Sequence, residues 1–377
     1  MLLNRLRIAN FRNHSATDID CPEGTLLLLG ENGAGKTTVL EAISLLCTSR
    51  SFVTRQDKGL VAIGAQQFSL EGAFTTSTRS RRHVTVEYPL DQRKRIEVDF
   101  TPLDAASDLI GMFPLVALSP QHRPITSGGP AERRAFIDFV LSQVHHNYLE
   151  DLLTYRRVLK QRNTLLAEAD GRLSAIAGVI DAWDQALAES GVRILRKRAE
   201  FIGQYLPYVH QSMSGIIEGR ESVDINYVGS CSADITSGDA AAQYLTELIE
   251  RRPSDLRRGV TSMGPHRDDL SIMLNGLDVR AQASQGQHKT ILIALKIAEY
   301  HYLDEHLDET PLLLLDDVFS ELDDARLDRV LALTQGLGQT FITSAHTSLL
   351  HVLDGAPGDH HALRIESGGV YRLADVA

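Results

Sequence analysis

A glycine-rich stretch near the N-terminus constrains this chain more than any other feature. It reads Gly-Glu-Asn-Gly-Ala-Gly-Lys-Thr-Thr and occupies residues 30–38. An apolar run of strand length, 25–29, precedes it, and apolar residues at helical spacing follow it over 39–46. A strand, a glycine loop and a helix start are the context in which GxxxxGK[ST] is a phosphate-binding loop (P-loop). The stretch therefore predicts a nucleotide-binding α/β domain.

The residue types in this loop suit a nucleoside triphosphate. Glycines let backbone N–H groups converge on phosphate, and the helix N-terminus adds about half a positive charge there. Lys36 supplies a charge for the β and γ phosphates, and the Thr37 hydroxyl can bind Mg²⁺. We expect ATP and Mg²⁺ at this site. The candidate nucleotide-binding residues are Gly30, Glu31, Asn32, Gly33, Ala34, Gly35, Lys36, Thr37 and Thr38.

Size, charge and cysteine usage narrow the class of protein. The chain has 377 residues, enough for two lobes, with 43% hydrophobic and 23% charged residues as in soluble globular proteins. Its three cysteines form no CxxC pair, which argues against a disulfide framework or a zinc site and fits the cytoplasm. We expect no membrane span and no signal peptide. With a net charge of −11, nucleic acid would have to bind a local basic face.

A second motif closes the apolar run 312–315. Asp316 and Asp317 follow that run directly, as in a Walker B motif. In a parallel sheet the carboxyl ends of the strands lie on the ligand side. Asp316 would then hold Mg²⁺, and Asp317 would orient and deprotonate the attacking water. The alternative is a pair of solvated helix-capping carboxylates.

A third motif, Ser-Gln-Gly-Gln at 284–287, resembles the signature motif of ABC-type ATPases. Ser284, Gly286 and Gln287 are candidate nucleotide contacts, because a helix start presents N–H groups to an anion. In one chain this motif and the P-loop face different directions. In that family a second copy brings its signature to the γ-phosphate. The alternative is an ordinary serine N-cap.

Two further residues complete the candidate site. Thr340 to His346 is a buried strand that ends at a histidine, so His346 is a candidate sensor of the γ-phosphate. Gln121, after the apolar run 115–119, is a candidate Mg²⁺ ligand beside Thr37 and Asp316.

Basic residues gather in two kinds of segment. Residues 67–74, 83–88 and 95–100 alternate like antiparallel strands. The tips between them carry our first DNA-binding candidates, Arg79, Arg81, Arg82, Arg93, Lys94 and Arg95, although solvated turns are an equal alternative. The second candidates, Arg156, Arg157 and Arg162, lie in the mainly helical stretch 131–217, where a basic face can instead be a lobe interface.

The pattern of elements predicts an α/β fold with a mixed sheet and flanking helices, plus a mostly helical second lobe. We assign residues 1–120 and 285–377 to the ATPase lobe and 121–284 to the helical lobe. Gly171 and Gly191 are expected to break helices. Asn275-Gly276 predicts a hairpin turn, and 361–375 a closing hairpin.

The order of motifs resembles the RecF family of bacterial ABC-type ATPases, from about residue 2 to the end. The similarity is carried by 6–13, 30–38, 155–163, 264–270, 284–287 and 313–323. The stretches Tyr155–Asn163 and Gly264–Leu270 separate it from other ABC-type ATPases. The sequence departs from the family pattern at Val53, at His288-Lys289 and at His346.

The resemblance implies an ATPase head like those of SMC and Rad50 proteins, with a helical lobe replacing their coiled coil. It implies ATP-driven homodimerisation on DNA, slow DNA-stimulated hydrolysis, and work with RecO and RecR to load recombinase at gapped DNA in repair, replication restart and the SOS response. Val53 stands where the family usually has arginine, which weakens a DNA role for 50–58.

Two other classes of protein compete with this interpretation. The first is a transporter's nucleotide-binding subunit, but about 250 residues separate Lys36 from Ser284, far more than such compact subunits need. The second is a fused nuclease, which would need an acidic metal cluster beyond 317 within the roughly fifty residues after Asp323. Stimulation of ATP hydrolysis by DNA rather than by a membrane partner would separate them.

Overall fold

The computed structural model describes residues 1–169, 176–217, 221–320, 322–354 and 358–373. It contains two compact units: unit 1 is formed by 1–123, 208–220 and 284–377, and unit 2 by 124–207 and 221–283. The predicted division differs, because it placed 121–123, 208–220 and Ser284 in the helical lobe. The reason is that the end of the long helix α5 (Ala177–Ile216) packs within unit 1, where Gly215 lies against the side chain of Leu333.

A six-stranded sheet positions the nucleotide motifs in unit 1. Its order is β15 (Gly369–Arg372), β14 (His360–Glu366), β3 (Thr25–Leu29), β13 (Thr340–Ser344), β12 (Leu312–Asp316) and β8 (Leu115–Leu118). All neighbours are parallel except β14 and β15, which form the predicted closing hairpin over the residues described. The register pairs Leu29 with Ser344 and Asp316 with Thr343. The carboxyl ends of β3, β12 and β13 therefore meet at one edge.

A second, antiparallel sheet of unit 1 confirms the strands predicted between 67 and 98. Its order is β2 (His14–Asp20), β1 (Leu2–Phe11), β4 (Gln67–Thr75), β5 (Arg81–Pro89), β6 (Arg95–Val98) and β7 (Thr101–Pro102). Buried and more exposed residues alternate along β4, as expected for a sheet with one face on the core. The strand predicted over 95–100 ends earlier, because Asp99 and Phe100 form a turn.

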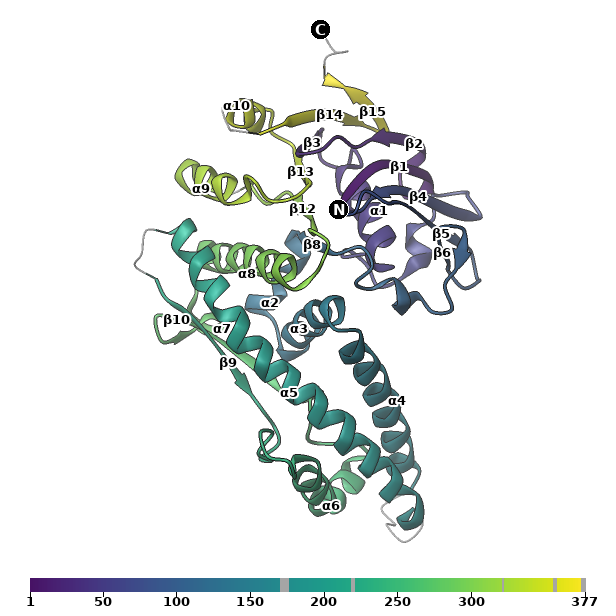
Figure 1. The fold of residues 1–377 in the computed structure, drawn as a ribbon, viewed down its shortest axis with the longest axis vertical. Coiled ribbons are helices and arrows are strands. Elements are labelled where there is room, and N and C mark those ends of the chain that lie inside the picture. The colour runs from purple at the N-terminus through teal and green to yellow at the C-terminus, as the bar shows by residue number, and fades with distance from the viewer. Residues whose placement is uncertain (170–175, 218–220, 321, 355–357, 374–377) are drawn as a thin grey trace. The chain divides into compact units, whose positions relative to one another are not determined.

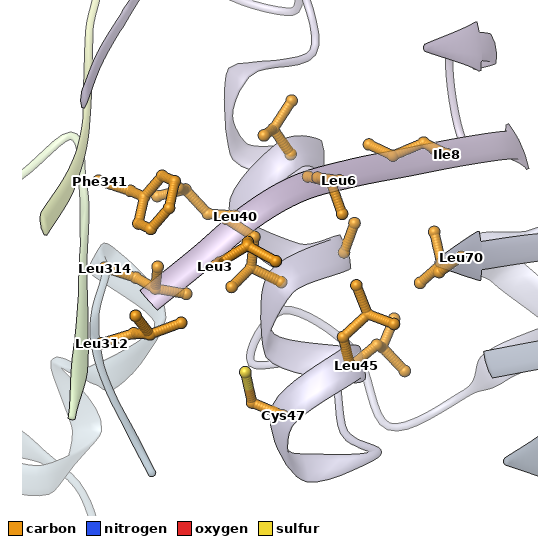
Figure 2. Close-up of a cluster of buried hydrophobic side chains, with 14 of the residues drawn as sticks. Leu3, Leu6, Ile8, Leu40, Leu45, Cys47, Leu70, Leu312, Leu314 and Phe341 are labelled. Atoms are coloured by element: carbon orange, nitrogen blue, oxygen red, sulfur yellow. The ribbon is translucent and has the colours of Figure 1, made fainter. Parts of the chain in front are cut away.

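Helix α1 (Lys36–Thr48) lies between the two sheets and buries every residue except Thr37. Its apolar side chains, such as Leu40 and Leu45, pack with residues of β1, β4, β12 and β13 (Figure 2). The helix is thus buried on every face, and its one carboxylate, Glu41, pairs with Arg12. The core therefore fixes the helix whose first residues, Lys36 and Thr37, are candidate phosphate-binding residues.

The remaining elements of unit 1 are α8 (Gln285–His306), α9 (Asp324–Thr334), α10 (Ser348–Asp354) and the short helices η1 (Asp57–Leu60), η2 (Ala106–Leu109) and η3 (Pro120–His122). Unit 2 holds α2 (Pro124–Ser127), α3 (Pro130–Val144), α4 (His146–Glu168), most of α5, β9 (Val223–Val228), α6 (Ala240–Arg258), β10 (Asp269–Leu274), β11 (Leu277–Asp278) and α7 (Val279–Gln282) (Figure 1). No described helix has the length and apolar character needed to cross a membrane.

Three predictions made from glycines in the helical lobe have different outcomes. The predicted break at Gly191 is wrong: it lies inside α5, where a Cβ would come within 3.4 Å of the rings of Tyr155 and Tyr244. Gly191 permits close packing of helices there instead of ending one. The predicted break at Gly171 lies outside the described residues. The turn at Asn275-Gly276 is confirmed, with φ of 52° and 80° between β10 and β11.

Unit 2 also brings together the two stretches that separate the resembled family from other ABC-type ATPases. The Tyr155 hydroxyl lies 2.7 Å from Nδ1 of His266. Gly264 has a φ of 116°, and a Cβ there would lie 2.5 Å from the same hydroxyl. Burial lowers the pKa of His266 to about 4. The stretch 264–270 thus packs against α4 as part of the fold of unit 2.

Candidate nucleotide-binding site

The P-loop is shaped by its glycines. Gly33 and Gly35 have φ values of 83° and 116°, in the region that L side chains rarely adopt. At Gly35 a Cβ would also lie 2.5 Å from Nε2 of His14. Strand β3 and helix α1, both fixed by the core, hold the two ends of the loop. Its backbone conformation therefore depends on its glycines and on the strand and helix that hold its two ends.

Lys36 lies across this loop. Its Nζ donates to the carbonyls of Gly30, at 2.7 Å, and Glu31, at 2.9 Å. The residue is only 8% exposed. Burial lowers the pKa of Lys36, while the carboxylates of Asp317 and Asp316 oppose that shift. The loop is thus closed around a cationic side chain.

Thr37 and Asp316, far apart in sequence, meet directly. The Thr37 hydroxyl donates to Oδ1 of Asp316 at 2.8 Å, and the Thr343 hydroxyl donates to the same oxygen at 2.8 Å. Burial raises the pKa of Asp316, and these two hydrogen bonds oppose the rise. The donor set of one hydroxyl and one carboxylate is chemically suited to Mg²⁺, which prefers oxygen ligands and keeps several waters. In the described part of the chain, no cluster of three or more His, Cys, Asp or Glu residues could hold a metal.

Asp317 sits in a different environment from its neighbour. Its φ is 51°, its side chain is exposed, and its backbone N–H donates to the Thr343 hydroxyl at 2.9 Å. The left-handed backbone turns the chain at the end of β12. One carboxylate is therefore buried beside Thr37 while the next is accessible to water.

A pocket of about 350 Å³ contains these groups. Its lining residues are Arg12, Asn13, Asn32, Gly33, Gly35, Lys36, Thr37, Thr38, Asp316, Asp317 and Thr343. A second pocket of about 670 Å³ adjoins the other part of the loop and is lined by Leu29–Ala34, Ala345, Thr347, Arg364–Ser367 and Leu373. Of the predicted loop residues, only Gly30, Glu31 and Ala34 line the second pocket without lining the first.

The sequence interpretation missed three of the lining residues. Asn13 donates to the Ala34 carbonyl at 3.1 Å and accepts from the Thr38 hydroxyl at 3.1 Å. Arg12 forms an ion pair with Glu41, which is buried inside α1. Arg12 and Asn13 belong to the stretch 6–13 that carries the family resemblance, so a signal existed for them. Thr343 had none beyond its place in a buried strand.

The signature motif lies at the start of α8. The Ser284 hydroxyl accepts from the Gln287 N–H at 3.2 Å, and the Gln287 side chain accepts from the Ser284 N–H at 2.9 Å. This capping box is the ordinary N-cap named as the alternative. A hydroxyl that accepts one hydrogen bond can still donate another. Ser284, Gly286 and Gln287 do not line the P-loop pocket, although Gly286 lines a separate pocket of about 420 Å³ with Asp316 and Asp317.

Comparisons with known proteins identify the family. The family model "RecF/RecN/SMC N terminal domain" matches residues 2–358. The "DNA replication and repair protein RecF" of Chloroherpeton thalassium is 38% identical over 91% of this chain and 95% of the relative. The chain belongs to the RecF family. Its ATPase-head fold, predicted from the motifs, is thereby confirmed, and a transporter subunit is not favoured.

Solved RecF structures agree with this assignment. A structure described as the recombination mediator protein RecF-ATP in the RecFOR pathway has a TM-score of 0.89 and 31% identity, covering 98% of this chain and 97% of its own. The corresponding RecF-ATPrS structure has a TM-score of 0.88 and 31% identity, covering 99% and 98%. This RecF-family chain therefore shares nearly the whole fold of those proteins.

Gln121 and His346 do not join the P-loop pocket of this RecF-family chain. Gln121 is exposed in η3, and His346 is exposed after β13. The His346 N–H donates to the Ser344 hydroxyl at 3.0 Å. Neither side chain lines the pocket that contains Thr37 and Asp316. Their proposed roles remain predictions.

The six basic tip residues are divided between the two ends of β5. Arg79, Arg81 and Arg82 lie where β5 begins, whereas Arg93, Lys94 and Arg95 lie where β6 begins after β5 has ended. The register pairs Arg95 with Glu87, five residues along β5 from Arg82, so the nearest members of the two groups are about 17 Å apart along the strand. They therefore form two basic sites, not one continuous patch.

Two of the six tip residues form ion pairs within the protein. Arg82 donates to Asp99 at 2.6 Å, and its guanidinium lies over the ring of Phe113. Lys94 is 12% exposed and pairs with Asp57 at 3.0 Å. The exposed members are Arg79, Arg81, Arg93 and Arg95.

The three helical candidates also differ among themselves. Arg162 is fully buried and bonds to Asp184 and to Asp255, the latter at 2.8 Å, so its proposed DNA contact is wrong. Arg156 is half exposed and pairs with Asp138 at 3.1 Å. Arg157 is exposed on α4. A basic run on a helix thus contains one residue that the fold of unit 2 requires.

Proposed function

We propose that this RecF-family protein is an ATP-dependent DNA-binding protein of recombinational repair and replication restart. The observation that carries the ATP-dependent part of the proposal is the 2.8 Å hydrogen bond from the Thr37 hydroxyl to Asp316, beside the Lys36 side chain that crosses the loop. It joins two motifs about 280 residues apart into one phosphate-binding pocket. The protein binds and slowly hydrolyses ATP, and DNA stimulates the reaction.

Each residue of the pocket has a defined task in this proposal. The loop N–H groups and Lys36 bind and orient the phosphates, and Lys36 exchanges its loop carbonyls for phosphate oxygens. Thr37 and Asp316 would hold Mg²⁺, which neutralises phosphate charge when bound. The accessible Asp317 orients water and accepts its proton.

A second copy of the chain completes the site. Ser284 and Gly286 do not line the P-loop pocket of their own chain, which supports a contact with the γ-phosphate bound in a second copy. A two-fold interface supplies this contact twice and encloses two ATP molecules. ATP binding therefore favours the dimer, and hydrolysis releases it.

The pathway assignment follows the relatives. Proteins similar over nearly the whole chain are named for DNA replication and repair and for recombination mediation in the RecFOR pathway. By analogy, this protein acts in the cytoplasm with RecO and RecR to load recombinase at single-strand gaps, and so supports the SOS response. Exposed basic residues such as Arg81 and Arg93 supply DNA contacts.

The test combines ATP hydrolysis with particle size. Wild-type protein is sized with no nucleotide, with ATP and Mg²⁺, and with both plus gapped DNA, while phosphate release is measured in each mixture. The proposal predicts a dimer only with ATP and faster hydrolysis with gapped DNA. A monomer under all conditions, or hydrolysis indifferent to DNA, would contradict it.

A further inference from the structure

An exposed aromatic ring lies beside one of the two basic sites. Phe100 is 78% exposed although it is a large apolar residue. Its ring stacks on His83 of β5, with the ring centroids 5.1 Å apart and the ring planes 15° from parallel. One ring face is therefore supported by the protein while much of the residue faces solvent.

The backbone holds Phe100 in an unfavourable conformation. Asp99 and Phe100 form a two-residue loop between the paired residues Val98 and Thr101, with φ values of 51° and 63°. Such a loop favours Asn or Asp followed by Gly, because both positions need positive φ. A bulky side chain at the second position is strained, and strain of this kind clusters at functional sites.

Asp99 fixes this arrangement through contacts to β5. Its side chain accepts from the backbone N–H of His83 at 2.8 Å and from Arg82 at 2.6 Å. Its own N–H donates to the His83 carbonyl at 2.8 Å. The turn is thus pinned on the strand, and the stacked pair of rings is held in place before any ligand arrives.

The charges around the stacked rings favour an anionic ligand. Arg81 is two residues before His83, hence on the same face of β5 and about 7 Å away along the strand. Arg79 and Arg81 are both exposed. Of the nearby carboxylates, Asp99 is bound by Arg82, and Glu71, 4.0 Å from the His83 ring, also pairs with Arg7 at 3.4 Å. Glu97 lies opposite Thr85, and Glu309 accepts hydrogen bonds from Ser77 in the turn that carries Arg79.

We propose that Phe100, backed by His83 and flanked by Arg79 and Arg81, is a stacking site for an unpaired base of single-stranded DNA. An aromatic face accepts any base, and the arginines bind the adjoining phosphates. A base inside a duplex presents no free face, so the site distinguishes gapped from fully paired DNA. This inference rests on the proposed function and specifies the part of its DNA substrate that the protein touches.

The test compares binding of full-length protein, with ATP, to a gapped duplex and to a fully paired duplex of equal length. Phe100→Ala and Phe100→Leu should each weaken binding to gapped DNA about fivefold or more, with paired DNA unaffected. Phe100→Trp should retain wild-type affinity. Ile63→Ala, which removes another exposed apolar side chain, is the matched control and should change nothing.

A second readout reports the stack itself. In a Trp183→Phe background, Phe100→Trp places the only tryptophan at the site. Its fluorescence should be quenched by gapped DNA and much less by a gap whose nucleotides are abasic. Equal binding of wild type and Phe100→Ala to gapped DNA, equally weakened binding to both DNAs, or no base-dependent quenching would overturn the stacking site. Wild-type protein that binds neither DNA would instead overturn the proposed function on which it rests.

Discussion

The nucleotide pocket and the basic ends of strand β5 are built on opposite principles. In the pocket, Lys36 donates hydrogen bonds to the loop backbone, and Thr37 donates one to Asp316. At the ends of β5, Arg79, Arg81 and Arg93 lie exposed to solvent. A P-loop binds phosphate through a rigid loop of backbone N–H groups, whereas contacts to a DNA backbone need exposed basic side chains. The comparison predicts large effects of substitution in the pocket and small, additive ones at the strand ends.

The largest effect is expected at Asp317. Asp317→Asn keeps the size and hydrogen bonding of the side chain but cannot accept a proton. ATP hydrolysis should fall about 100-fold or more, because general-base catalysis contributes that much. ATP binding should remain and the DNA-bound dimer should accumulate. Single-turnover phosphate release measures this change. If Asp317→Asn hydrolysed ATP at the wild-type rate, Asp317 would not be the general base. The remaining candidates would be His346 and Glu321, and Glu321 lies outside the described residues.

The largest effect on stability, as opposed to activity, separates buried from exposed arginines. Arg162→Ala removes one partner from a buried ionic cluster with Asp184 and Asp255. The free energy of unfolding should fall by about 3–5 kcal/mol, because uncompensated buried charge remains. Arg157→Ala, on the exposed face of the same helix, should change it by less than about 0.5 kcal/mol. Equal denaturation midpoints for the two variants would contradict the assignment.

A smaller effect is expected at Lys36. Lys36→Ala removes the charge that bridges the β and γ phosphates, so ATP affinity should fall at least tenfold, about 1.4 kcal/mol. Lys58→Ala, an exposed lysine paired with Asp91, serves as the control. Titration with a fluorescent ATP analogue measures both. Unchanged affinity in folded Lys36→Ala protein would rule out the P-loop assignment.

The smallest effects are expected at the ends of β5. Neutralising Arg79, Arg81, Arg93 or Arg95 singly should lower the slope of log K against log salt by up to about 0.9 for each DNA phosphate that the variant no longer binds. Arg82 and Lys94 already bind Asp99 and Asp57, so replacing them should leave the slope nearly unchanged. DNA binding measured over a range of salt concentrations tests this prediction. Slopes equal to the wild-type slope in all six variants would exclude both basic sites.

The same comparison explains what could be predicted from the sequence. The P-loop conformation depends on neighbouring residues, so Gly35, Lys36 and Thr37 were recognisable from local spacing. The meeting of Thr37 with Asp316 followed from the general rule for parallel sheets. The role of Asn13 and the burial of Arg162 depend on tertiary contacts, to Ala34 and to Asp184, that local patterns do not encode. The separation of the six basic residues into two sites could be seen only from the pairing of β5 with its neighbouring strands.

Phe100 illustrates the same limit at a single residue. The alternation of apolar residues over 95–100 predicts a strand, in which the Phe100 side chain would be one of the residues of a sheet face. The chain instead turns at Asp99, and the ring lies exposed on His83. The loop Asp99-Phe100 contains no glycine, the residue that most strongly indicates such a turn. The sequence therefore carries no clear turn signal there.

Mixing two inactive variants tests most directly whether Ser284 of one copy completes the ATP site of another. Ser284→Arg places a bulky side chain in the dimer seam, while Lys36→Ala disables the P-loop. Each variant alone should lack hydrolysis. In a mixed dimer, one composite site keeps an intact P-loop and an intact signature, and the other loses both. Partial recovery of ATP hydrolysis on mixing is the predicted result; no recovery, with mixed dimers shown to form, would contradict the account.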